Sequence, residues 1–106
     1  MKYEVIVMPS AEKDVIEIVR YISDNLQNKK AASEYFSAFK DGLESLESMP
    51  ERNPISSLDF LTERKLRLLP IGNYAAIYKV FEDERRVEVY RVLYAKMDLE
   101  EKVGKE

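Results

Sequence analysis

The chain opens with a strand-like pattern at residues 2–8, where β-branched and aromatic residues dominate. Apolar side chains fall on both alternating faces, so we expect both faces of this strand to be covered. Pro9 ends the strand, and Ser10 can cap a helix whose first turn carries Glu12 and Asp14. Acidic residues there interact favourably with the helix dipole. The pattern predicts a strand that leads directly into a helix.

Two amphipathic helices are predicted next, each with an apolar face at three- and four-residue spacing. The first face consists of Val15, Ile18, Val19, Ile22 and Leu26. After a polar turn at 25–30, the second consists of Ala32, Tyr35, Phe36, Phe39, Leu43 and Leu46. The second helix closes before Pro50, because the residue before a proline disfavours helical geometry. We expect the two helices to form an antiparallel hairpin, since neither buries its face alone.

The second half of the chain predicts a loop and then a β meander. Residues 51–63 are irregular, and Pro70 ends the first of three strands, which are expected at 64–69, 74–81 and 86–94. The element order is β-α-α-β-β-β. It predicts an α+β fold in which a helical hairpin packs on one face of an antiparallel sheet. At 106 residues, we expect a single domain over 1–106.

Composition excludes several classes of function. Cysteine and histidine are both absent, so disulfides, thiolate zinc sites and an imidazole base are excluded. Acidic residues show no ligand-like spacing, and we expect no metal and no cofactor. No apolar run approaches the roughly 20 residues that cross a bilayer, and the start lacks a secretory pattern. These features predict a cytoplasmic protein without a membrane partner.

The net charge of −3 affects the choice of partner. Dedicated nucleic-acid binders usually carry a basic excess, because phosphate neutralisation supplies much of their affinity. The balance here favours a protein partner.

Basic and aromatic residues on the predicted strands are the candidate site. Lys65 and Arg67 are two residues apart and share a face, and Arg91 lies near them if the last strand is central. Lys79 and Lys96 can extend this patch, and Tyr78 and Tyr94 add aromatic surface. Such a mixture binds single-stranded nucleic acid through phosphates and bases, but a solvated outer sheet face has the same composition.

RNA cleavage would need more than this patch supplies. It requires a general base, a general acid and stabilisation of charge on the phosphate. Arg67 and Arg91 can stabilise that charge, but a tyrosine or lysine base would need a strongly lowered pKa.

The order of these segments resembles the RelE/ParE superfamily of type II toxin–antitoxin toxins over nearly the whole chain. The opening Met8-Pro9-Ser10-Ala11-Glu12-Lys13-Asp14 is similar to the family's, as are Gly72-Asn73-Tyr74 and Ile77-Tyr78-Lys79-Val80 in the meander. The resemblance continues from Val87 through Leu99. It implies the fold expected above.

The resemblance is closer to the ParE branch than to the RelE branch. An arginine that RelE-like members carry after the strand-opening aromatic corresponds to Ala75, and a histidine frequent near the end of the last strand corresponds to Tyr94. These replacements weaken an enzymatic reading. The ending Lys96-Met97-Asp98-Leu99 is more similar to ParE members, which inhibit DNA gyrase.

The resemblance implies a toxin that inhibits growth by binding DNA gyrase and that a cognate antitoxin neutralises. The toxin would be a homodimer or would form a heterotetramer with the antitoxin. Residues that would contact the target or the antitoxin are Lys65, Arg67, Tyr78, Arg91, Tyr94, Lys96 and Asp98.

Two alternatives stay open at this point. One is a ribosome-dependent mRNA endoribonuclease that uses Arg67, Arg91, Tyr94 and Lys96. The other is a degenerate, non-toxic relative that acts only as a binding module. The tail at 98–103 is expected to form a helical turn, because Asp98 can cap it.

Overall fold

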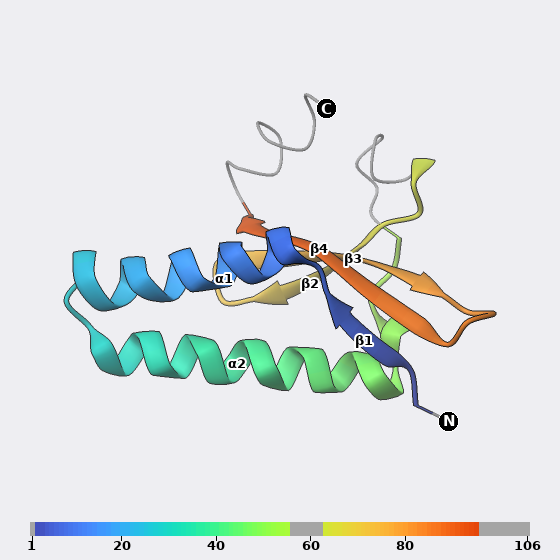
Figure 1. Ribbon diagram of the computed structural model, residues 1–106, viewed down its shortest axis with the longest axis horizontal. Helices are drawn as coiled ribbons and strands as arrows, with labels where there is room; N and C mark the ends of the chain where they lie inside the picture. The colour runs from blue at the N-terminus through green and yellow to red at the C-terminus, as the bar shows by residue number, and fades with distance from the viewer. Residues whose placement is uncertain (1, 56–62, 96–106) are drawn as a thin grey trace.

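The computed structural model describes residues 2–55 and 63–95 (Figure 1). Its elements, in order, are β1 (Glu4–Val7), α1 (Pro9–Arg20), a π-helical turn (Tyr21–Asn25), α2 (Lys29–Ser48), a 3₁₀ turn (Pro50–Arg52), β2 (Arg67–Ile71), β3 (Tyr74–Phe81) and β4 (Arg86–Tyr94). The predicted α+β class and element order are confirmed. The predicted helical turn at 98–103 lies outside the described residues.

The four strands form one sheet in the order β1-β4-β3-β2. β2, β3 and β4 form the predicted antiparallel meander, but β1 pairs with β4 in parallel, with Val5 opposite Val87. The expectation of a wholly antiparallel sheet was therefore wrong. Parallel neighbours need a long connection, and here the helical hairpin and two strands lie between them. A pattern of apolar residues shows which face is buried but not the direction of the neighbouring strand.

β2 forms one edge of the sheet and continues through Pro70, which sits opposite Ala75. The sequence had placed the end of this strand at Pro70. A proline is tolerated in an edge strand because its missing N–H can face away from the ladder. Lys65, two residues before the start of β2, has a positive φ of 58°, so β2 begins only after this turn.

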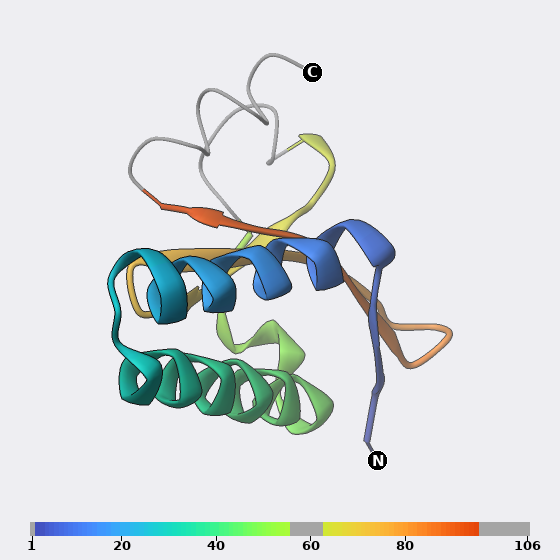
Figure 2. The same ribbon diagram turned by 60° about the vertical axis from the view of Figure 1, so that its left-hand side comes forward.

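Both helices pack on the same face of the sheet, as Figures 1 and 2 show. The core between them contains Val15 and Ile18 of α1, Phe39 and Leu46 of α2, and sheet residues that include Val89. Each of these five side chains is buried. The predicted hairpin and its position on one sheet face are thus observed.

A glycine allows α2 to approach the sheet closely. A Cβ atom at Gly42 would lie 3.1 Å from Cδ2 of Leu69 and 3.7 Å from Cδ1 of Ile71. The missing side chain lets these two core residues of β2 fill the space against the helix.

Two residues that the apolar spacing placed on buried helix faces are exposed. Leu26 follows the π-helical turn, whose extra residue shifts the helical phase, and its side chain is 57% exposed. Phe36 is 44% exposed on the outside of α2. The buried stripe of α2 is narrower than the sequence pattern indicated.

A β-bulge in β4 changes which side chains face the helices. Ile77 pairs with Arg91 while the next residue, Tyr78, pairs with Val89, so Tyr90 is the extra residue. Strict alternation would place Arg91 on the face of Val89. The bulge instead puts Val89 and Val92 together in the helix-side core.

Within the part of the chain that the structure describes, no helix is long and apolar enough to span a bilayer.

Candidate functional site

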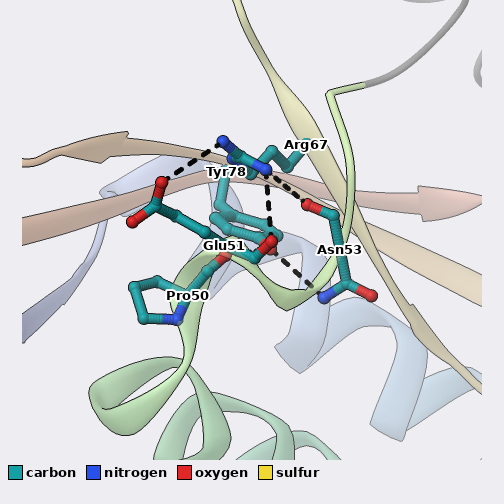
Figure 3. A network of polar contacts seen from close by, with 5 residues as sticks. All are labelled: Pro50, Glu51, Asn53, Arg67 and Tyr78. Carbon is teal, nitrogen blue, oxygen red and sulfur yellow. Dashed lines mark hydrogen bonds and ion pairs between the residues drawn. The ribbon is translucent and has the colours of Figure 1, made fainter.

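Arg67 and Tyr78 hold the segment after α2 against the sheet (Figure 3). The hydroxyl of Tyr78 donates to the carbonyl of Pro50 at 2.7 Å and accepts from Nδ2 of Asn53 at 3.2 Å. Nη1 of Arg67 donates to the Asn53 carbonyl at 2.7 Å, and its Nη2 lies 3.9 Å from a carboxylate oxygen of Glu51. This set, here called the Tyr78 network, ties residues 50–53 to β2 and β3.

The chemistry of Tyr78 does not suit a general base. Its side chain is fully buried, and this burial raises the pKa of the hydroxyl above 10.0, although Asn53 and Arg67 counteract the rise in part. A base at neutral pH needs a lowered pKa. Tyr78 therefore acts as a structural hydrogen-bonding group.

Arg91 is held by Asp14 of α1. Nε of Arg91 donates to Oδ2 of Asp14 at 2.7 Å, and Nη2 donates to Oδ1 at 3.1 Å. The backbone N–H of Val92 also donates to Oδ2, at 2.9 Å. β1 ends at Val7, opposite Val89, so the N–H of Val92 in β4 lies beyond the end of β1. Asp14 accepts the hydrogen bond from this N–H. The carboxylate neutralises Arg91 and completes the edge of the sheet.

Tyr94 belongs to a chain of three aromatic rings rather than to a cluster of cations. Its ring meets Tyr74 edge-on at 5.5 Å, and Tyr74 meets Tyr35 in the same way at 5.5 Å. Such edge-to-face pairs stabilise packing. The ring chain joins the end of β4 to α2.

The predicted grouping of Lys65, Arg67 and Arg91 is not observed. Arg67 lies opposite Tyr78 and shares the helix-side face, whereas Arg91 lies opposite Ile77 of the other face. Lys65 is exposed in the turn before β2. Strand order separates them, because β3 lies between β2 and β4.

Ala75, Lys96 and Asp98 were also named from the sequence. Ala75 is buried and pairs with Leu93, so it serves packing. Lys96 and Asp98 lie outside the described residues.

A groove of about 700 Å³ opens on the sheet face that points away from the helices. Its apolar lining includes Leu66 and Ile77, and its polar lining includes Arg64, Lys79 and Tyr90. Residues at the start of α1 and Arg91 complete it. We call it the sheet groove. An apolar floor with cations beside it suits an apolar segment that carries carboxylates, or another anionic polymer.

Sequence reasoning missed Arg64 and gave Lys79 a minor role. The signal was present, because Lys79 lies two residues from Ile77 and shares its face of β3. Arg64 reaches the sheet groove because of the turn at Lys65, and the spacing of apolar residues does not indicate that turn.

A second polar network borders the sheet groove. The Tyr90 hydroxyl donates to Oε1 of Glu88 at 2.9 Å, and Nε of Arg86 donates to Oε2 at 2.9 Å. The guanidinium of Arg86 also stacks on Phe81, at 4.4 Å from the ring centroid. Glu88 thereby neutralises Arg86 beside the groove. Of the three cations that line the groove, Arg91 is paired with Asp14, whereas Arg64 is exposed and Lys79 is half-exposed.

The protonation of Tyr90 predicts an alkaline loss of stability. Burial, and then the hydrogen bond to Glu88, raises the pKa of Tyr90 from 10.0 to about 12. The folded protein keeps this proton above the pH at which the unfolded chain releases it, so the contribution is complete below pH 10 and disappears as pH rises through about 12. Urea unfolding at successive pH values is expected to show a steeper decline for wild type than for Tyr90→Phe. Equal slopes would contradict this assignment.

The described residues contain no cluster of three or more acidic side chains arranged to hold a metal ion. The sheet groove brings together three cations, of which Arg91 is paired with Asp14, one phenol and an apolar floor.

Comparison with known proteins gives the following findings. Residues 5–99 match the family model described as the ParE toxin of the type II toxin–antitoxin system parDE. No curated protein sequence matches the chain.

Several solved structures share the fold. One is from a chromosomal ParDE toxin–antitoxin system of P. aeruginosa, with a TM-score of 0.70 at 12% identity over 89% of this chain and 97% of that one. An archaeal RelE–RelB complex from Pyrococcus horikoshii OT3 has a TM-score of 0.60 at 17% identity, covering 92% and 99%. A RelBE toxin–antitoxin complex from Mycobacterium tuberculosis has 0.56 at 19%, covering 89% and 99%.

Proposed function

Because the chain belongs to the ParE toxin family of type II toxin–antitoxin systems, we propose that it inhibits growth by binding DNA gyrase through the sheet groove. The observation that carries this proposal is the separation of the would-be RNA-cleaving residues. Arg67 is bound to the Asn53 carbonyl on one side of the sheet, and Arg91 is bound to Asp14 at its edge. The two guanidinium groups are therefore held by different partners in different parts of the sheet.

Binding, in contrast, needs only a shaped surface with complementary charge. The sheet groove provides buried apolar side chains at Leu66 and Ile77 beside Arg64 and Lys79. In an interface, the apolar floor supplies affinity, and the flanking cations orient an acidic partner segment. This division of roles requires no base and no metal.

We further propose that a cognate antitoxin neutralises the toxin by covering this groove. The solved relatives from Pyrococcus horikoshii OT3 and Mycobacterium tuberculosis are toxin–antitoxin complexes. A segment with carboxylates and apolar side chains fits the cations and the floor of the groove. Antitoxin and target would then compete for one surface, in the cytoplasm.

A second candidate is a ribosome-dependent endoribonuclease. The observation in its favour is that Arg64, Lys79 and Tyr90 line one groove, since cations and an aromatic ring also bind RNA phosphates and bases.

Induced expression in cells without the antitoxin separates the candidates. We expect growth arrest, loss of negative supercoiling in a reporter plasmid and no new mRNA 5′ ends. Co-expression of the antitoxin should restore growth. Codon-phased mRNA cuts with intact plasmid supercoiling would instead establish the endoribonuclease, and unaffected growth would indicate a non-toxic relative.

A further inference from the structure

Glu88 lies on the outer face of the sheet, among the charges that border the sheet groove. Because both of its neighbours in sequence belong to the helix-side core, its side chain projects from the opposite face. The carboxylate accepts from Nε of Arg86 and from the hydroxyl of Tyr90, each at 2.9 Å. The residue opposite it on β3 is Lys79, which lines the groove. One carboxylate therefore binds two groups of its own strand and lies beside a cation of the next strand.

The ion pair with Glu88 prevents Arg86 from acting as a further anion-binding group. The side chains of Arg86 and Glu88 are 29% and 19% exposed, so solvent screens the pair only in part. The Arg86 guanidinium lies 4.4 Å from the centroid of the Phe81 ring, and Nζ of Lys79 lies 5.2 Å from the same centroid. Two cations around an aromatic ring are a combination that binds phosphates and bases of single-stranded nucleic acid. Here the combination includes a carboxylate that opposes phosphate.

A nucleic-acid strand and a peptide meet this arrangement differently. A nucleic-acid strand carries negative charge along its whole length, so a strand that contacts Lys79 also brings phosphate charge toward Glu88. A peptide can place a carboxylate against Lys79 or Arg64 and a basic side chain or an N–H against Glu88. The Tyr90 hydroxyl directs its proton to Glu88, so its oxygen is an acceptor for such a donor. The border of the groove thus suits a partner that carries both signs of charge.

We propose that Glu88 determines the specificity of the sheet groove: by holding Arg86 it excludes nucleic acid, and it admits a protein segment of mixed charge. A charge placed against the wrong partner contributes to specificity together with the contacts made to the right one. This inference rests on the proposed binding function of the groove and adds the chemical class of its occupant. It does not depend on which protein is the target.

Binding of a short fluorescein-labelled oligouridine to the full chain tests the inference. Glu88→Gln keeps the size of the side chain and an oxygen acceptor for Tyr90, but removes the charge that holds Arg86. At low salt we expect Glu88→Gln to bind the oligouridine at least about fivefold more tightly than wild type. The slope of log K against log salt should become more negative by about 0.7, because Arg86 adds one phosphate contact.

Three further variants show whether the gain depends on charge and on Arg86. Addition of Arg86→Gln to Glu88→Gln should return the affinity and the salt slope to their wild-type values. Glu88→Asp keeps the charge and should bind the oligouridine as weakly as wild type. Glu34→Gln removes an equal charge from an exposed position on α2 and should change the affinity by less than about twofold. Circular dichroism establishes that each variant is folded.

Two results would overturn the inference. One is a Glu88→Gln variant that binds oligouridine no more tightly than wild type; tight binding by both proteins at physiological salt would assign the groove to RNA. The other is a gain in Glu88→Gln that persists when Arg86→Gln is added. The assay contains no gyrase, so the two proposals fail separately. A wild type that leaves supercoiling unaffected would reject the proposed target, and the expected oligouridine result would still support the role of Glu88.

Discussion

Replacing Asp14 with alanine is expected to lower the free energy of unfolding by about 2–3 kcal/mol. The carboxylate accepts three hydrogen bonds, two from Arg91 and one from the backbone of Val92. Its side chain is 12% exposed and that of Arg91 is 33% exposed. Removing it leaves a poorly solvated guanidinium and an unpaired N–H. The loss stays below that of a fully buried pair, because water still reaches Arg91.

Urea unfolding of three variants measures this effect. Asp14→Asn keeps one acceptor oxygen and should lose roughly half as much. Glu17→Ala removes an exposed carboxylate from the same helix and should change stability by less than about 0.5 kcal/mol. An Asp14→Ala variant as stable as Glu17→Ala would contradict the role assigned to Asp14.

The second large effect is expected for Tyr78→Phe, which should cost about 1–3 kcal/mol. The substitution retains the buried ring but removes the hydroxyl, so the carbonyl of Pro50 and the amide of Asn53 lose their partner. Segment 50–53 should then detach more readily. Limited proteolysis should cut it faster than in wild type.

Tyr21→Phe is the matched control for this substitution. Its ring is 47% exposed, so water can solvate the hydroxyl, and its loss should be nearly neutral. Equal stability and equal cleavage rates in the two variants would argue against the Tyr78 network as the anchor of this segment.

Much of the fold could be predicted from the sequence because its helices are strongly periodic. Spacing in α1 and α2 gave the hairpin, and Pro50 gave its end. The direction of β1 could not be predicted, since its partner β4 lies about 80 residues away and alternation does not encode strand direction. The π-helical turn that exposes Leu26 likewise has no signature in the apolar spacing.

The candidate site was predicted less well, because its geometry depends on contacts between distant residues. Arg91 was recognised as a cation, but Asp14, which neutralises it, is 77 positions earlier in the chain. The bulge at Tyr90 also moves Arg91 off the face that alternation assigns to it. Arg67 was placed on an open surface, whereas the loop at Asn53 covers it. The sequence indicated which charged residues belong to the candidate site. Which group pairs with each of those charges could be seen only in the folded structure.

The central claim is that the toxin acts by binding through the sheet groove, and a supercoiling assay with purified DNA gyrase tests it most directly. Wild type should inhibit supercoiling, and Lys79→Glu should need at least about tenfold more protein, because it reverses a charge within the groove. Lys29→Glu, at an exposed position at the start of α2, should inhibit as wild type does. Supercoiling that is unaffected by wild type, or inhibited equally by Lys79→Glu, would contradict the claim.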